Sequence, residues 1–177
     1  MDVATHLRGM FAFGLWDGDR RRLVLARDRF GKKPLFHAIV RRGLPDEALI
    51  FASSLPALLA HPDLPRRVRP RAVEEFLAFT YVPEPATILK DVRQVRAAHV
   101  LVYEGGGVAE RRYWDLEYEP KPAVTEAEAE ARVRAELDEA VRVRMESEAP
   151  FGFLLSAGID SAAVAAVMRS GSPSFAR

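Results

Sequence analysis

One stretch near the C-terminal end, residues 150–168, constrains the fold more than any other part of the sequence. An apolar segment of strand length at residues 151–155 runs directly into Ser-Ala-Gly-Ile-Asp-Ser at residues 156–161, and an Ala/Val-rich segment with helix-forming composition follows. A strand, a tight turn of small residues and a helix N-terminus form a corner whose free backbone N–H groups attract anions.

The polar residues of this corner favour a polyphosphate. Ser156 and Ser161 supply hydroxyl donors, and Asp160 is placed to hold a divalent metal against the phosphates. The stretch is not a Walker loop, because the Gly-Lys-Ser/Thr ending is missing. The same small residues also occur in an ordinary strand–helix turn, and spacing alone favours that interpretation over a phosphate site.

Composition describes a folded protein and excludes several classes of function. The 177 residues are 49% hydrophobic and 29% charged, and 26 Lys and Arg balance 25 Asp and Glu. The net charge of +1 therefore gives no reason to expect a nucleic-acid partner. The absence of Cys excludes disulfides, thiolate metal sites and a cysteine nucleophile within this chain. No run is long enough for a membrane span and no signal sequence is evident, so we expect a cytoplasmic location and no membrane partner.

The first part of the chain predicts an antiparallel sheet. Apolar segments at residues 9–16, 23–26, 35–40 and 48–52 have strand character and short connections, which suggests a four-stranded meander with one or both faces covered. The charged connection at residues 27–33 is interpreted as a solvated turn or a domain interface rather than a phosphate-binding segment.

Turn and cap signals divide the next part of the chain. Ser54 is placed to cap a short helix, and Pro70 begins another, with Val73, Phe76 and Leu77 on one side. Strands at residues 100–103 and 108–113 flank three glycines and predict a hairpin. His99 precedes that hairpin, and we expect it to hydrogen-bond a loop rather than to act in catalysis.

Residues 125–148 give the clearest helix signal. Thr125 and Glu128 have the spacing of a capping box. An apolar stripe recurs at steps of four, and we expect it to pack on the sheet begun by residues 151–155. The stripe consists of Ala129, Val133, Leu137, Val141 and Met145.

Several of these stretches together resemble known families. The Ser-Ala-Gly-Ile-Asp-Ser loop is similar to the pyrophosphate loop of the ATP-pyrophosphatase superfamily, Ser-Gly-Gly-x-Asp-Ser, with Ala157 at the first Gly. The segments at residues 9–17, 25–36 and 51–53 resemble the later strands of the glutaminase domain of glutamine-dependent asparagine synthetases. Residues 81–83, 99–103 and 112–114 resemble the segment that leads out of that domain.

The resemblance implies a fold class and domain boundaries. The fold would be α+β followed by α/β, with part of an Ntn-type glutaminase sandwich joined to the first strand-loop-helix of an ATP-pyrophosphatase (adenine nucleotide alpha hydrolase-like) domain. Residues 1–115 would be the C-terminal part of the glutaminase domain, residues 116–124 a linker, and residues 125–177 the N-terminal part of the synthetase domain.

The resemblance also implies a function. In that family, glutamine-derived ammonia amidates aspartate through a β-aspartyl-adenylate, with ATP and Mg²⁺ as cofactors and glutamine, aspartate and ATP as small-molecule substrates; a homodimer is also compatible with it. The implied ATP-binding residues are Leu154, Leu155, Ser156, Ala157, Gly158, Asp160 and Ser161. Asp160 would also be the Mg²⁺ ligand, and no residue is assigned a catalytic role.

Departures from the family pattern leave two alternatives open. Met1 does not lead into the family's nucleophilic Cys, and most of the synthetase site lies outside the sequence, so we expect the isolated chain to be inactive. Ala157 places a Cβ where the family brings a glycine backbone close to phosphate. The alternatives are another ATP-dependent amidotransferase of the same superfamily, such as a β-lactam-synthetase-like enzyme, and a non-catalytic fragment or scaffold.

Overall fold

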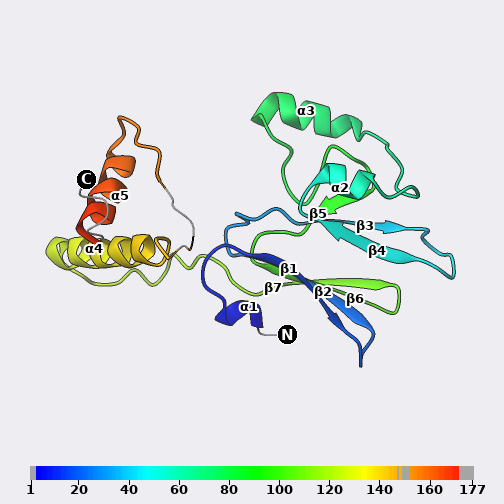
Figure 1. The fold of residues 1–177 in the computed structure, drawn as a ribbon, viewed down its shortest axis with the longest axis horizontal. Helices are drawn as coiled ribbons and strands as arrows, with labels where there is room; N and C mark the ends of the chain where they lie inside the picture. Colours follow the sequence, from blue (N-terminus) through cyan, green and yellow to red (C-terminus); the bar gives the residue numbers. More distant parts are fainter. Residues whose placement is uncertain (1–2, 147, 149–151, 172–177) are drawn as a thin grey trace. The chain divides into compact units, whose positions relative to one another are not determined.

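The computed structural model describes residues 3–146, 148 and 152–171 (Figure 1). The chain divides into two units, Met1–Glu117 and Tyr118–Arg177. The boundary between them falls inside the predicted linker at residues 116–124, whereas the assignment of each unit to a named domain stays a prediction. Among the described residues, no helix has the length and apolarity that crossing a bilayer would require.

The first unit contains two antiparallel sheets and three short helices. One sheet has the order β1-β2-β6-β7, and the other has the order β4-β3-β5. The strands are β1 (Ala12–Asp17), β2 (Arg22–Arg27), β3 (Phe36–Val40), β4 (Ala48–Ala52), β5 (Val92–Gln94), β6 (His99–Glu104) and β7 (Gly107–Arg112). The helices are α1 (Val3–His6), α2 (Leu55–Leu59) and α3 (Pro70–Phe79).

The α+β prediction with antiparallel strands is confirmed, but the single meander is wrong. β1 and β2 pair in one sheet, while β3 and β4 pair in the other. The second neighbour of β2 is β6, which follows it by more than seventy positions, and β3 pairs on its other side with the three-residue β5. Hairpins are readable from local turn signals, whereas the choice of a distant second neighbour depends on tertiary packing.

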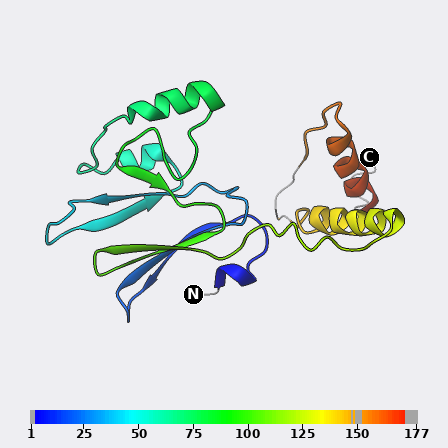
Figure 2. The ribbon, with the colours of Figure 1, turned by 180° about the vertical axis from the view of Figure 1, so that it is seen from behind.

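The two sheets lie face to face between helices, as Figures 1 and 2 show from opposite sides. Side chains alternate across each strand, so every second residue points into the space between the sheets. Leu25 and Leu101 are buried there and contact Leu49 of the other sheet. Gly14 allows the closest approach, because a Cβ at this position would lie 2.5 Å from the ring of Phe51.

The outer faces of the two sheets are covered by helices. α1 lies on the four-stranded sheet, where Ala4 is buried with Val24 and Val100. α2 covers the three-stranded sheet, and Leu58 is buried with Ala38 and Val40. Each sheet therefore has apolar side chains on both its inner and its outer face, which explains why these strands lack a simple alternation of apolar and polar residues.

The predicted caps and hairpin are present. The Ser54 hydroxyl accepts a hydrogen bond from the Ala57 N–H at the start of α2, and Pro70 occupies the first turn of α3. β6 and β7 form the predicted hairpin, with Gly105 and Gly106 at positive φ. The predicted apolar side of α3 is not buried, because Val73, Phe76 and Leu77 are 46%, 54% and 78% exposed.

The second unit consists of α4 (Glu126–Arg142) and α5 (Ile159–Gly171), which pack against each other. The capping box is confirmed, since Thr125 accepts from the Glu128 N–H and Glu128 accepts from the Thr125 N–H. α4 ends six residues before the predicted end at residue 148. Its stripe is buried only towards the C-terminal end, because Val141 is buried while Val133 is 68% exposed.

The predicted strand at residues 151–155 is not formed. Residues 152–155 have no regular structure, and Phe151 lies outside the described residues. The stripe of α4 therefore packs on α5 rather than on a sheet. A parallel strand satisfies its backbone groups only by pairing with other strands, and the described part of this unit contains none.

Candidate functional site

The loop before α5 is held by its two serines. The hydroxyl oxygens of Ser156 and Ser161 are 2.8 Å apart, and the Gly158 N–H donates to the Ser156 hydroxyl at 3.2 Å. The Ser161 hydroxyl lies 3.1 Å from the Ser156 carbonyl oxygen and 3.0 Å from that of Gly158. These contacts bend residues 156–161 into a compact turn at the helix N-terminus. The structure thus brings Ser156, Gly158 and Ser161 together.

The electrostatics of this turn favour an anion. The first backbone N–H groups of a helix have no intrahelical acceptor. In α5 they precede the first helical hydrogen bond, from the Ala162 N–H to the Gly158 carbonyl, and belong to the exposed Ile159 and Asp160 and the partly exposed Ser161. The helix dipole adds partial positive charge at the same end. Ala157 is exposed and its φ is not positive, so its Cβ introduces no backbone strain.

The remaining predicted residues do not form a pocket. Leu154 is 96% exposed and Leu155 is 64% exposed, so the described residues build no apolar slot for an adenine ring. Asp160 is exposed and its carboxylate contacts no other described side chain. No group of three or more metal-binding side chains occurs in the described ranges. The residues present therefore fit the phosphate end of a nucleotide, where a Mg²⁺ ion needs only one or two carboxylates besides phosphate oxygens and water.

The charged connection at residues 27–33 is buried at its start, which contradicts a solvated turn there, while the alternative of a domain interface stays a prediction. Arg27 is 5% exposed. Its guanidinium donates to the carbonyl oxygens of Lys33, Val95 and Gly31 at 2.9, 2.7 and 2.6 Å, and it forms an ion pair with Glu84. Gly31 has a φ of +62°, and a Cβ there would lie 2.8 Å from that guanidinium. Arg27 therefore organises three loops of the first unit.

Asp28 has the complementary role of binding backbone donors. It is 1% exposed, and its carboxylate accepts from the N–H groups of Phe30, Lys32 and Lys33 at 3.2, 3.0 and 3.0 Å. Burial acts to raise the pKa of Asp28, but these backbone donors outweigh it, and the pKa lies below its usual value. The sequence signal that could have indicated this role is the tight Asp-x-x-Gly spacing, in which an Asp often binds the following backbone.

His99 has the structural role that the sequence predicts. It is the first residue of β6, and its Nδ1 atom lies 2.7 Å from the carbonyl oxygen of Ala97. That contact and a second hydrogen bond, from the Ala98 N–H to the Asp28 carbonyl oxygen, together hold the loop before β6. The partner of the imidazole is a backbone carbonyl group rather than a nucleophilic side chain, which is not the arrangement of a catalytic acid or base.

Two families of known proteins match successive parts of the chain. Residues 1–114 match the family described as glutamine amidotransferase domain, and residues 132–176 match the family described as asparagine synthase. The first match covers most of the two-sheet unit. The second includes the loop before α5 together with the greater part of α4.

The proteins that are similar to this chain include both asparagine synthetases and an amidase. Asparagine synthetase [glutamine-hydrolyzing] 3 of Bacillus subtilis is 36% identical over 167 residues, which cover 94% of this chain and 26% of the relative. Amidase chyE of Penicillium rubens is also 36% identical, over 172 residues that cover 95% of this chain and 24% of the relative. A putative asparagine synthetase of Methanocaldococcus jannaschii is 30% identical, with 95% and 32% covered.

The chain thus spans about a quarter to a third of the length of these relatives. Their resemblance to this chain continues through both units, in the same order as the two family matches. The match over residues 1–114 and the antiparallel two-sheet unit that those residues form lead to the same assignment: the chain belongs to the glutamine amidotransferase domain family.

Proposed function

We propose that this chain is part of an asparagine synthetase (glutamine-hydrolysing), an ATP-dependent ligase that amidates aspartate with ammonia from glutamine. The observation that carries the proposal is the order of the two family matches along one chain, 1–114 and then 132–176. In the resembling family the glutaminase segment supplies ammonia to a second segment that uses it, and the loop before α5 has donors for the phosphates of an activating nucleotide.

In this proposal each residue of the loop has a separate task. ATP, when bound, supplies the activation of the acceptor carboxylate. The hydroxyl groups of Ser156 and Ser161 and the first N–H groups of α5 bind its phosphates, with Gly158 allowing the close turn. Asp160 holds Mg²⁺ against the phosphate oxygens. Leu154 and Leu155 would contact the adenine, provided that residues 151–155 pair with further strands.

The isolated polypeptide is proposed to be inactive. It contains no Cys, whereas glutamine hydrolysis in the resembling family uses a cysteine nucleophile. The described residues also build no apolar slot for adenine. Purified chain incubated with glutamine, aspartate and ATP–Mg²⁺ should therefore release neither glutamate nor asparagine, and formation of asparagine would refute this part of the proposal.

A second candidate is ATP-dependent amide formation on a different acceptor. Amidase chyE, whose name does not specify aspartate or asparagine, is as similar to this chain as the asparagine synthetase of Bacillus subtilis is, at 36% identity. Because the phosphate loop serves any acyl activation, its residues do not select the acceptor. Expression of the complete reading frame, followed by assays with aspartate and with other carboxylates, distinguishes the two candidates.

The experiment that tests the loop is calorimetric titration of the chain with ATP–Mg²⁺ and with pyrophosphate–Mg²⁺. We expect weak binding of both, with similar affinity, because the described contacts reach only the phosphates. Ser161→Ala and Asp160→Asn should remove the part of the heat that depends on Mg²⁺, whereas Ser170→Ala, a serine at the other end of α5, should leave that part unchanged. Absence of binding by both the chain and Ala157→Gly would contradict the phosphate assignment.

A further inference from the structure

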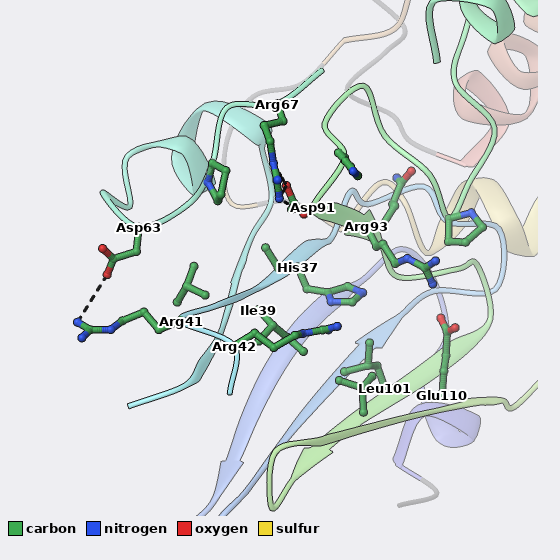
Figure 3. A pocket seen from close by; sticks show the side chains of 17 residues that line it. His37, Ile39, Arg41, Arg42, Asp63, Arg67, Asp91, Arg93, Leu101 and Glu110 are labelled. Atoms are coloured by element: carbon green, nitrogen blue, oxygen red, sulfur yellow. Dashed lines mark hydrogen bonds and ion pairs between the residues drawn. The ribbon is translucent and has the colours of Figure 1, made fainter. Parts of the chain in front are cut away.

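A second candidate anion-binding site, lined by basic residues, lies in the two-sheet unit, far in sequence from the loop before α5. A cavity of about 670 Å³ opens between the sheets, bordered by β3 and β5 on one side and by β6 and β7 on the other. This volume lies in the range of small-molecule sites. His37, Arg93 and Glu110 point into the space between the sheets, where core positions are normally apolar (Figure 3).

The charges that line this cavity are unbalanced. Its three carboxylates already have partners: Asp91 is bonded to Arg67 by two guanidinium nitrogens, Asp63 lies 3.9 Å from Arg41, and Glu110 pairs with Arg96. Three further cations also line it, and among the described residues their side chains form no hydrogen bond or ion pair. These three cations are Arg42, Lys90 and Arg93.

His37 provides an independent sign of a ligand. The side chain is only 9% exposed, yet its imidazole has no hydrogen-bond partner among the described residues. Every side-chain nitrogen or oxygen that is fully buried in the described part of the chain has a hydrogen-bond partner. The unbonded imidazole nitrogens of His37 are therefore accessible, and the residue lines the cavity. Burial lowers the pKa of His37 from its ordinary value, with Glu110 acting to raise it and Arg93 to lower it.

The sheet register explains why these groups meet. Arg93 of β5 is the cross-strand partner of His37 of β3, so both side chains lie on the inner face of the three-stranded sheet. Glu110 of β7 is the partner of Leu101 of β6, on the inner face of the other sheet. Arg42 lies two residues after the end of β3, and its side chain lines the same cavity as the imidazole of His37 (Figure 3).

We propose that this cavity binds a small anion with two or more phosphate charges, which Arg42, Arg93 and Lys90 neutralise and His37 hydrogen-bonds. Guanidinium groups match the geometry of phosphate oxygens, and uncommitted cations around a partly enclosed space favour a multiply charged ligand over a single carboxylate. The site differs from the loop before α5 in its residues, in its unit and in requiring no metal.

The probe is pyrophosphate in the presence of EDTA, which removes the metal that the loop at residues 156–161 would need. Titration of the full chain is followed by NMR of the imidazole resonances, with His37 identified through His37→Gln and with His6, His61 and His99 as internal references. We expect a saturable shift of the His37 resonances and a rise in its pKa, because the bound anion favours the imidazolium.

Matched variants test the assigned cations. Arg93→Gln and Arg42→Gln should each weaken pyrophosphate binding about tenfold, the loss of one charge-assisted contact. Arg20→Gln, an exposed arginine in the β1–β2 turn, should bind as the unmodified chain does. Circular dichroism of each variant establishes that the fold is retained.

Three outcomes would overturn the proposal. Equal shifts produced by sodium chloride at matched ionic strength would indicate screening rather than binding. Tighter binding of citrate than of pyrophosphate would contradict the phosphate class. Pyrophosphate that perturbs residues 156–161 but not His37 would contradict this site while leaving the proposed function intact.

Discussion

The guanidinium of Arg27 donates a hydrogen bond of 2.6 Å to the carboxylate of Glu84, and the two residues are 57 positions apart in the sequence. The same carboxylate accepts from the Ala97 N–H, so Glu84, in the loop before β5, connects the end of β2 to the loop before β6. Arg27 is buried whereas Glu84 is 37% exposed, which makes the arginine the costlier partner to lose.

We therefore predict unequal effects of replacing the two residues. Arg27→Ala leaves three carbonyl groups and a carboxylate without their donor, and it should lower the free energy of unfolding by about 3 kcal/mol. Glu84→Gln should cost only about 1 kcal/mol, because water reaches this side chain. Urea denaturation followed by tryptophan fluorescence measures both, with Arg20→Gln as a control; an Arg27→Ala value equal to that control would disprove the network.

Asp28 should give the first unit a specific dependence on acid. Its folded-state pKa lies below the unfolded value of 3.8, so its contribution to stability is complete above that value and is lost as the pH falls through the folded-state pKa. Asp28→Asn should be less stable near neutral pH by about 1–3 kcal/mol and should lose less stability on acidification. Asp17 and Glu75 also have lowered pKa values, so the informative quantity is the difference between the variant and the unmodified chain.

That difference is measured as urea midpoints between about pH 7 and pH 2, the range over which carboxylates titrate. Glu75→Gln serves as the comparison, because its partner Arg69 is a side chain rather than backbone. Parallel pH curves for Asp28→Asn and the unmodified chain would show that Asp28 does not have the assigned role.

Gly14 and Phe51 should show coupling between the two sheets. A Cβ at residue 14 would lie 2.5 Å from the Phe51 ring, so Gly14→Ala forces the ring outward and should destabilise the fold by about 1 kcal/mol. The ring is 42% exposed, which keeps the cost small. Phe51→Leu should relieve the clash, so the double variant should be more stable than the sum of the two single changes predicts. A double-mutant cycle with strictly additive values would contradict this contact.

The capping box of α4 should control local opening of that helix. Thr125→Ala removes the acceptor of the Glu128 N–H, and it should weaken the first turn by about 1 kcal/mol. Amide exchange at Glu128 should then be about fivefold faster, whereas Thr125→Ser, which keeps the hydroxyl, should exchange as the unmodified chain does. Unchanged exchange in Thr125→Ala would show that the cap does not control opening of the first turn.

The sequence by itself determined the features that depend on neighbouring residues. Ser54, Pro70 and the Thr125–Glu128 pair mark helix starts because a cap is completed within four residues. The β6–β7 hairpin was likewise predictable, since its turn glycines lie between the two strands. The composition of residues 156–161 also predicted the small-residue turn at the start of α5.

Only the tertiary structure decided the features that depend on distant partners. It placed β2 beside β6 and β3 beside β5, and it buried Arg27 against Glu84. It also left residues 152–155 without a strand, because the described residues of the second unit include no strand that could complete their hydrogen bonds. The physical reason is the same throughout: a cap or a turn carries its hydrogen-bond partners within its own few residues, whereas a sheet, a buried ion pair or a cavity needs partners that only folding brings together.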